Sequence, residues 1–370
     1  MTAKHELPGE FELIRMINKK FHRSPDQVNQ PFETDAELVA WRGGLLAFTM
    51  DEFSEEEEYI GTMDPFLLGW NIAVGVISDL LAVGAAPLFY SHACVLSNRF
   101  TGSYRDRFFE GINRAVTEAG AYLIGGDLGI SDVWRYTGAA FGEVEQSRVR
   151  KRIGIEPTDS LYVTGMLGDG NRAALLNFLS GNDGCAVQQF PPEYRTTRFE
   201  LRLAESNRIG SYSTVCMDTS DGLIRTLSTL TGLNPCALVI DPGLIPYDQI
   251  SVSVMEMLDM PPEALLFGSA GEYELFFTVP AYAEAALIEE NRGRLQLRKI
   301  GRAVPGMGLY FIRSGHDLDS LNDTDTDAFL ADGNTCISLA SVDLDPRKME
   351  DTGRYIEVLL KTVKDLFYQD

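Results

Sequence analysis

The stretch GWNIAVGVISDLLAVGAAP, residues 69–87, gives the clearest structural signal in the chain. Its apolar side chains recur at helical spacing, at Ile72, Val76, Leu80 and Val83. This pattern predicts a helix with a buried face, which Pro87 ends. Asp79 falls on that face, where a carboxylate is costly unless a hydrogen bond or a cation compensates it. The sequence is compatible with both explanations, a hydrogen-bonded structural aspartate and a metal ligand.

Three further aspartates follow apolar runs that are typical of strands. Asp51 follows LLAFTM, Asp127 follows AYLIGG and Asp218 follows STVCM. We predict that each aspartate ends its strand, at the sheet edge where α/β proteins gather ligands. No Lys or Arg lies within several residues of Asp51 or Asp79. Converging carboxylates of this kind favour a shared Mg²⁺ ion over Zn²⁺.

A magnesium site suggests bound phosphate, because Mg²⁺ often takes substrate phosphates as ligands. Phosphoryl transfer mainly requires the phosphate oxygens to be aligned and neutralised. The glycines of the turn after residue 164 serve either as anion-binding N–H donors or as a flexible strand–helix turn; they are Gly165, Gly168 and Gly170. No hydrolase, metalloprotease or cysteine–histidine motif surrounds the four histidines, which are His5, His22, His92 and His316.

Predicted strands and helices alternate along the chain, which indicates an α/β (α+β) fold. At 370 residues the chain is long enough for two domains. The basic segment RVRKRIGIEPTD, residues 148–159, marks the expected boundary. We therefore predict an N-terminal domain over residues 1–148, a C-terminal α/β domain over 149–310 and an extension over 311–370 with a closing helix.

Composition excludes several classes of partner. The formal net charge of −22 at pH 7 disfavours nucleic acid, because the field of the whole molecule repels phosphates. The five scattered cysteines form no CxxC pair, which indicates free thiols in a reducing compartment. No signal peptide begins the chain, and no run of about 18–20 apolar residues predicts a membrane span. We expect a cytoplasmic protein without a membrane partner.

Other segments give more limited expectations. Ser220 or Asp221 is expected to cap the helix after Asp218. Glu272 and Glu274 are expected to face solvent. The acidic stretch at residues 323–334 is expected to be a surface loop, since it lacks the glycine and the final glutamate of a calcium loop.

Taken together, several motifs resemble the aminoimidazole ribonucleotide synthetase superfamily and, within it, most closely the thiamine-monophosphate kinase family. The resemblance covers about residues 9–305. It is carried by GEFELI at residues 9–14, the stretch at 69–87, LIGGD at 123–127, YVTGMLG at 162–168 and MDTSDGL at 217–223.

This resemblance implies a two-domain fold whose N-terminal domains pair as a homodimer around a β-barrel. It also implies that ATP and Mg²⁺ are bound and that a γ-phosphoryl group is transferred to a small-molecule acceptor. The metal ligands it implies are Asp35, Asp51, Asp79, Asp127, Asp218 and Asp221. The nucleotide contacts it implies are Gly125, Gly126, Arg152 and Ser220, with Asp127 and Asp218 as the catalytic residues.

The chain departs from the kinase pattern in several segments, and two of them, EEEEY at residues 55–59 and SAGEYEL at 269–275, hold the acceptor in the family. ETDAE at residues 33–37 keeps one aspartate of a pair, and SAGEYEL at 269–275 has Gly271 in place of a glutamate. The acceptor is thiamine monophosphate or a different metabolite. The alternatives are an ATP-dependent synthetase of the superfamily and a nucleotide-binding paralogue without turnover.

Overall fold

The computed structural model describes residues 10–55, 63–182, 190–312, 318, 326–331, 336–338 and 359–364. Half of the predicted acidic surface loop at 323–334 lies outside these residues, and the described half, Thr326–Ala331, is helical, so the expectation of a loop is wrong there. Of the predicted closing helix, residues 359–364 are described, and they are helical.

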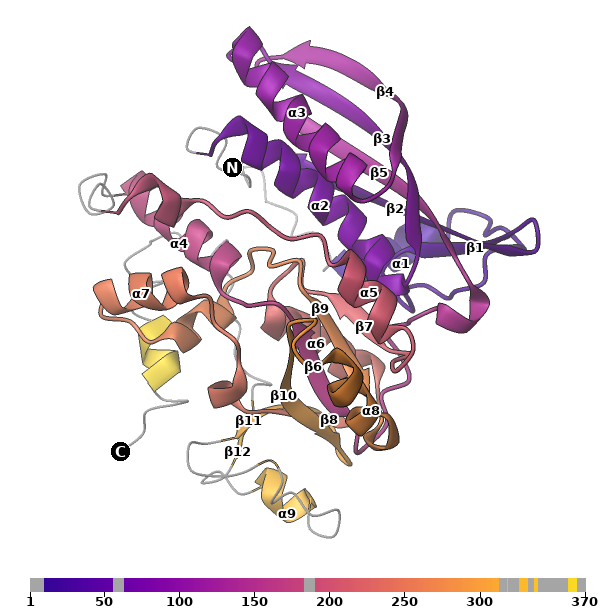
Figure 1. Ribbon diagram of the computed structural model, residues 1–370, viewed down its shortest axis with the longest axis vertical. Coiled ribbons are helices and arrows are strands. Elements are labelled where there is room, and N and C mark those ends of the chain that lie inside the picture. The colour runs from indigo at the N-terminus through magenta and orange to yellow at the C-terminus, as the bar shows by residue number, and fades with distance from the viewer. Residues whose placement is uncertain are drawn as a thin grey trace, which may run out of the picture.

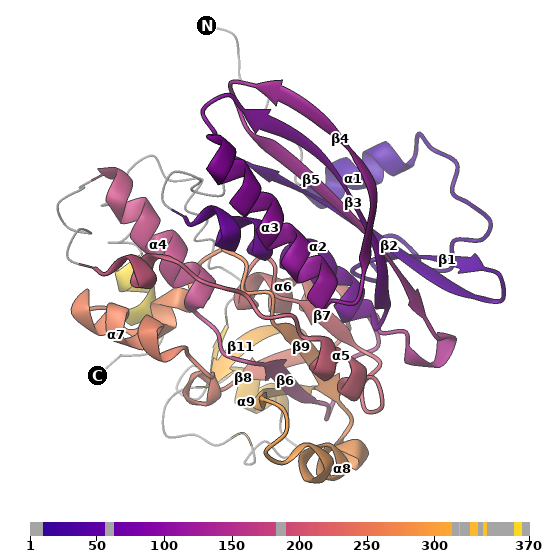
Figure 2. The ribbon, with the colours of Figure 1, turned by 45° about the horizontal axis from the view of Figure 1, so that its top comes forward.

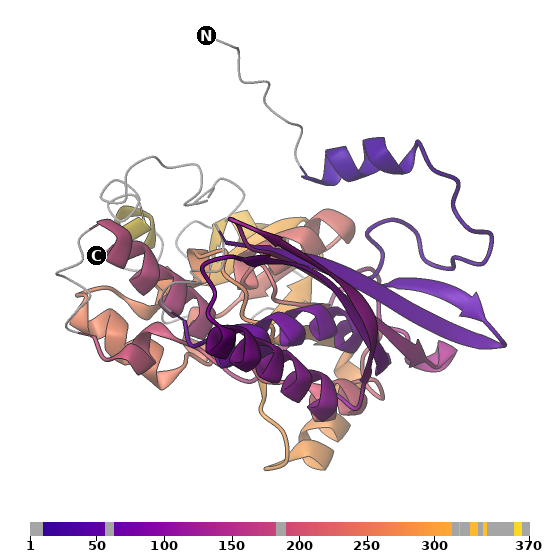
Figure 3. The same cartoon turned by 90° about the horizontal axis from the view of Figure 1, so that it is seen from above.

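The N-terminal half forms a five-stranded sheet with the order β1-β2-β5-β3-β4. All neighbours pair antiparallel except β3 and β4, which run parallel. Helices α2 and α3 cover one face of this sheet, and α1 lies on the other side (Figures 2 and 3). The elements are α1 (Glu10–Asn18), β1 (Glu37–Trp41), β2 (Gly44–Ser54), α2 (Pro65–Val83), β3 (Ala86–Ser97), α3 (Gly102–Glu118), β4 (Tyr122–Ser131) and β5 (Arg135–Val144).

The C-terminal half forms a seven-stranded mixed sheet with the order β12-β11-β8-β10-β6-β9-β7 (Figure 1). Its strands are β6 (Ser160–Thr164), β7 (Cys216–Asp218), β8 (Ala237–Ile240), β9 (Leu275–Val279), β10 (Leu297–Val304), β11 (Gly308–Ile312) and β12 (Cys336–Ser338). Its helices are α4 (Asp169–Asn182), α5 (Leu203–Ile209), α6 (Leu223–Leu233), α7 (Gln249–Met257), α8 (Ala281–Asn291) and α9 (Thr326–Ala331). Short 3₁₀ turns are η1 (Gln146–Arg148), η2 (Pro192–Arg195), η3 (Pro242–Leu244) and η4 (Pro262–Phe267).

The predicted mixed α/β class is confirmed, but several predicted ends are wrong. β2 and β4 continue beyond Asp51 and Asp127, so neither aspartate ends its strand. Helix α2 ends before Pro87, because Gly84 adopts a left-handed conformation (φ 87°) and returns its N–H to the last helical turn. Asp218 does end β7, as predicted.

Helix α2 joins the two halves of the molecule. Its apolar side chains belong to one core cluster that also contains Cys216, Leu275 and Phe277 from the second sheet. The helix is long and apolar enough to meet the criteria for a membrane span, contrary to the sequence expectation, but 83% of the apolar window is buried inside the protein. It is the core helix that brings Asp79 towards the end of β7.

Two glycines allow α2 and α3 to cross closely. A Cβ added to Gly69 would lie 2.0 Å from the Phe108 carbonyl oxygen, and one added to Gly111 would lie 2.0 Å from the Phe66 carbonyl oxygen. Because the obstructing atoms are backbone, a larger residue at either position would force the helices apart.

We therefore expect Gly111→Ala to lower the free energy of unfolding by about 1–3 kcal/mol, the usual cost of overpacking. Urea unfolding followed by circular dichroism measures this effect. Gly102→Ala in the same helix is the control, since its added Cβ would meet only the Arg105 side chain at 3.9 Å. Equal stability of the two variants would contradict the close crossing.

Candidate active site

Three carboxylates from separate parts of the chain converge between the two sheets. One oxygen from each of Asp35, Asp79 and Asp218 lies within 4.8 Å of the others. Asp35 precedes β1, Asp79 stands near the end of α2, and Asp218 is the last residue of β7. We call these three residues the acidic cluster. The predicted meeting of Asp79 with Asp218 is therefore present in the structure.

The acidic cluster is only partly satisfied by hydrogen bonds. Thr49 donates its hydroxyl to Asp79 over 2.5 Å. Arg152 donates its Nε to Asp35 Oδ1 over 2.8 Å, and Ser220 donates its hydroxyl to Asp218 Oδ1 over 2.8 Å. The other oxygens of Asp35 and Asp218 are buried and find no hydrogen-bond partner among the described residues.

Burial and mutual repulsion raise the carboxyl pKa values. Loss of solvation is the largest cause at every position, and it raises the pKa of Asp35 to about 6 although Arg152 opposes the shift. The pKa of Asp51 rises to about 7, because burial is reinforced by the charges of Asp218 and Asp35. The pKa of Asp79 rises well above its ordinary value for the same reasons, and burial also raises that of Asp218.

This donor set fits a hard divalent cation. The ligands on offer are carboxylate oxygens, two of which are buried without a partner. Mg²⁺ prefers such oxygens, and it removes the cost of keeping several like charges together. Asp51 is electrostatically coupled to the acidic cluster. Its charge raises the pKa of Asp79, and the charges of Asp218 and Asp35 raise the pKa of Asp51.

The other sequence-predicted residues occupy different places. Arg152 and Ser220 contact the acidic cluster through Asp35 and Asp218. Asp221 is solvent-exposed in the turn before α6 and is not part of the cluster. Gly125 and Gly126 lie in β4, where Gly126 packs against His92 of β3.

Asp127 is remote from the acidic cluster. It is exposed on β4, and β5 and β3 separate that strand from β2. Asp51 is in register with Gly138, Gly138 with His92, and His92 with Gly126. Three strand spacings make roughly 14 Å between the backbones of Asp51 and Gly126, so Asp51 and Asp127 do not hold one ion together.

The N–H groups of Gly165 and Gly170 are not free to bind an anionic ligand, because groups of the protein already accept their hydrogen bonds. Glu272 accepts hydrogen bonds from the N–H groups of Gly170 and Asn171 at the start of α4, each over 3.1 Å. The N–H of Gly165 is bonded to the Gln296 carbonyl oxygen over 2.9 Å. Of the two interpretations of these glycines, the flexible strand–helix turn is the correct one, because the Glu272 carboxylate occupies the N-terminal end of α4.

Two expectations from the sequence are wrong here, that Glu272 and Glu274 face solvent and that Ser220 or Asp221 caps α6. Glu272 and Glu274 are buried, each with 5% exposure, and burial raises the pKa of each to about 7. Arg202 donates its Nε to Glu274 over 2.6 Å. Ser220 does not cap α6, whose N-cap is Gly222 without a side-chain hydrogen bond, and neither does Asp221. Polar and apolar residues alternate around Glu274, as is typical of a strand with one exposed face. The sequence therefore did not reveal the ion pair between Arg202 and Glu274.

Tyr273 connects the segment between these two glutamates to α2. Its backbone has a φ of 53°, which is unusual for a bulky side chain. A Cβ added to Gly75 of α2 would lie 3.1 Å from the tyrosine ring, so a small residue is needed there. Phe199 packs edge-on against the same ring at a centroid distance of 4.8 Å. The segment that holds Glu272 and Glu274 is thus fixed against the helix that carries Asp79.

Comparison with known proteins agrees with this geometry. Residues 33–144 match the family described as AIR synthase related protein, N-terminal domain. A thiamine-monophosphate kinase from Halobacterium salinarum is 30% identical over 241 residues, which cover 64% of this chain and 77% of the relative. One from Escherichia coli K12 is 28% identical over 325 residues and covers 83% and 94%.

Solved structures give the same result. The structure "AaThiL complexed with AMPPCP and TMP" superposes with a TM-score of 0.69 at 25% identity, covering 84% of this chain and 96% of that one. A hydrogenase maturation protein, HypE of E. coli, shares the fold with a TM-score of 0.61 at 17% identity, covering 85% and 98%. Fold and sequence therefore define a protein of the AIR synthase related class. Within that class, the chain belongs to the thiamine-monophosphate kinase family.

Removing one charge from the acidic cluster should stabilise the metal-free protein. Asp79 holds its proton more tightly when folded than when unfolded, so its contribution to stability falls as pH rises. Asp79→Asn cannot ionise. We expect it to raise the free energy of unfolding by about 1–3 kcal/mol at about pH 8, and by less at about pH 5.

Thermal unfolding in EDTA at both pH values measures this gain. Asp106→Asn, an exposed position on α3, is the control and should change little. A destabilised Asp79→Asn protein at the higher pH would contradict the repulsion that the structure indicates.

Proposed function

We propose that this protein is a Mg²⁺-dependent kinase that transfers the γ-phosphoryl group of ATP to a small acceptor, in the simplest case thiamine monophosphate. The convergence of Asp35, Asp79 and Asp218, with unpaired buried oxygens, is the observation that carries this proposal. It is supported by the kinase names of the relatives and by the AMPPCP in the similar structure.

In this proposal Asp35, Asp79 and Asp218 hold the metal, with Asp51 beside them. Mg²⁺ would supply positive charge to the phosphate oxygens as the transferred group moves. Arg152 orients Asp35 through its hydrogen bond and opposes the rise in the pKa of that carboxyl, and its guanidinium would contact a phosphate bound beside the cluster. Ser220 fixes the rotamer of Asp218 through its hydroxyl. An acceptor oxygen would attack the γ-phosphorus in line with the departing ADP.

Asp127, Asp221, Gly125 and Gly126 remain proposed nucleotide or metal contacts. Their exposure on β4 and in the turn before α6 leaves them accessible to a bound nucleotide. Among the described residues, the carboxylate oxygens close enough to hold one cation with Asp79 are those of Asp35 and Asp218, and neither Asp127 nor Asp221 belongs to that set. Asp127 therefore keeps its proposed catalytic role only through a second ion or a direct contact with the phosphates.

The altered segment SAGEYEL bears on the identity of the acceptor. In the segment SAGEYEL, Glu272 caps α4 and Glu274 pairs with Arg202, so both side chains serve the architecture. This altered segment supports three alternatives: a different acceptor metabolite, a ring-closing synthetase reaction, or loss of turnover. Depletion of ATP with thiamine monophosphate alone, among a panel of acceptors, would select the kinase.

We expect Asp218→Asn to reduce Mg²⁺-dependent ATP consumption about 100-fold or more, the usual effect of losing a key electrostatic group. The measurement is a coupled ADP assay with thiamine monophosphate as the acceptor. Asp106→Asn is the matched control and should keep full activity. Unchanged turnover by Asp218→Asn, with the protein folded, would refute the proposed site.

We also propose that two copies associate through the edge strand β4. Among the described strands it pairs with β3 alone, and its side chains include Leu123, Ile124, Leu128 and Ile130, each more than half exposed. A long apolar edge is an aggregation hazard unless it is covered, and a second copy would cover it and extend the sheet.

Leu128→Asp should therefore convert the protein to a monomer, because a charge would be buried in the pairing surface. Sedimentation equilibrium gives the mass. Tyr282→Asp, which changes an exposed aromatic side chain on α8 (89% exposed), is the control and should leave the mass unchanged. A wild-type monomer, or an unaltered dimer of Leu128→Asp, would exclude β4 as the interface.

We propose that the two domains, each built on one sheet, have different roles. Residues 1–148 would bind the nucleotide and the second copy, and residues 149–310 would complete the cleft through Asp218. The second sheet extends past that boundary, since β11 ends at Ile312 and β12 lies beyond it. A cytoplasmic location, without nucleic acid or membrane as a partner, remains part of the proposal.

A further inference from the structure

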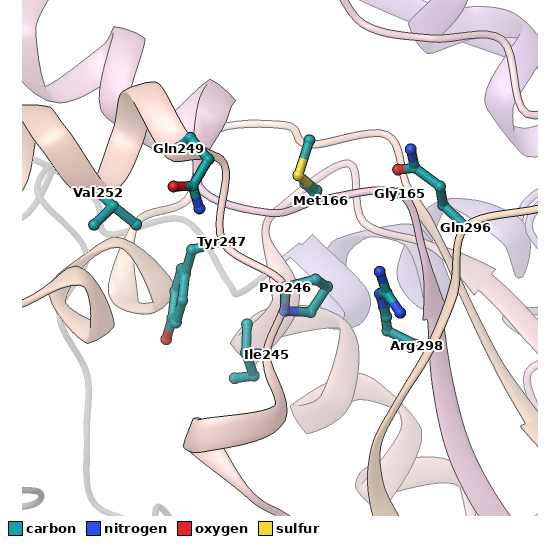
Figure 4. A pocket seen from close by; sticks show the side chains of 9 residues that line it. All are labelled: Gly165, Met166, Ile245, Pro246, Tyr247, Gln249, Val252, Gln296 and Arg298. Atoms are coloured by element: carbon teal, nitrogen blue, oxygen red, sulfur yellow. The ribbon is translucent and has the colours of Figure 1, made fainter.

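A cavity lies in the C-terminal half, and none of the acidic-cluster residues lines it (Figure 4). Its volume is about 420 Å³, within the range of small-molecule sites. It is open to solvent on one side and is bordered by the turn after β6, the start of β10 and the connection from η3 into α7. The lining residues are Gly165, Met166, Ile245, Pro246, Tyr247, Gln249, Val252, Gln296 and Arg298.

Backbone hydrogen bonds hold the walls of this cavity in place. Gly165 donates its N–H to the Gln296 carbonyl over 2.9 Å, which joins the turn to the start of β10. Leu167 donates to the Pro246 carbonyl over 2.8 Å, and Asp248 donates to the Leu167 carbonyl over 2.9 Å. Three separate segments are thereby tied to one another, so the cavity is pre-formed and does not depend on a bound molecule.

The side chains combine an apolar wall with one cation. Met166, Ile245, Pro246 and Val252 give the wall its apolar surface, and no lining residue is acidic. Arg298 contributes the charge, and its guanidinium has no ion pair or hydrogen bond to the described residues. In Figure 4 the guanidinium extends from β10 towards the space beside Pro246 and Gln296.

An accessible arginine in a concave apolar site is selective for anions. The guanidinium fork matches carboxylate and phosphate oxygens, and an apolar wall strengthens such a contact by excluding water. The formal charge of −22 keeps anions away from most of the surface, so a local cation is needed to hold one. The amides of Gln249 and Gln296 can hydrogen-bond either a head group or a polar ring atom.

We propose that this cavity binds a small organic anion, with its phosphate or carboxylate on Arg298 and a flat apolar body against Pro246 and Met166. The site is separate from the one proposed for the nucleotide. Strand β9 lies between β6 and β7, so Asp218 is two strand spacings, roughly 10 Å, from the end of β6. The cavity lies on the opposite side of β6, beside β10.

Isothermal titration calorimetry with phenyl phosphate tests the proposal, because this probe carries both an anionic head and a flat apolar ring. Saturating AMPPCP and Mg²⁺ are kept in the buffer so that the acidic cluster is occupied. We expect saturable binding with a Kd of about 1 mM or tighter, as for other ligands of this size. Inorganic phosphate, which has the head without the ring, should bind about tenfold more weakly or not at all.

Two substitutions localise the binding. Arg298→Gln should weaken phenyl phosphate binding about tenfold, and Val252→Trp should weaken it by filling the cavity. Arg294→Gln is the matched control, because Arg294 is exposed in the turn before β10 and does not line the cavity. Circular dichroism confirms that each variant is folded. Absence of saturable binding, or equal affinities of Arg298→Gln and Arg294→Gln, would overturn the proposal.

Discussion

The structure depends on the burial of like charges where the two sheets meet. Asp35, Asp79 and Asp218 approach one another at the end of α2, and Asp51 adds its charge to theirs. Arg152 neutralises only part of this charge, through Asp35. The remainder must be compensated by protons, which the raised pKa values indicate, or by a cation. A protein built for stability alone would not retain such a group, since apolar residues of similar size would cost less.

The path of the chain serves this convergence. Helix α2 packs on the first sheet and shares its core with side chains of the second, so a single rigid element relates Asp79 to the end of β7. The close contacts at Gly69 and Gly111 fix the position of α2 against α3, because backbone atoms of the two helices touch there. On the second sheet, the 217–223 segment turns sharply after Asp218, and its Ser220 hydroxyl orients the carboxylate.

The segment with Glu272 and Glu274 shows how a motif that resembles a binding segment can serve the architecture. In sequence, its carboxylates resemble those that hold a substrate. In the structure, Glu272 accepts hydrogen bonds at the start of α4 and Glu274 pairs with Arg202. Tyr273 between them packs against α2. Their burial makes them part of the scaffold around the cleft. The chemistry that recognises the acceptor must therefore be supplied, at least in part, by other residues.

The sequence by itself determined the mixed α/β class, helix α2, strand β7 and the acidic character of the site, because these follow from apolar periodicity and from carboxylates placed on apolar faces. It also identified the family through motifs that are specific in combination. Only the tertiary structure decided which carboxylates meet. Asp127 and Asp51 look alike in sequence, yet strand order separates them, because two strands lie between β2 and β4. Likewise, only the packing of α4 against residues 269–275 revealed that Glu272 is buried, since local alternation does not show what will cover a side chain.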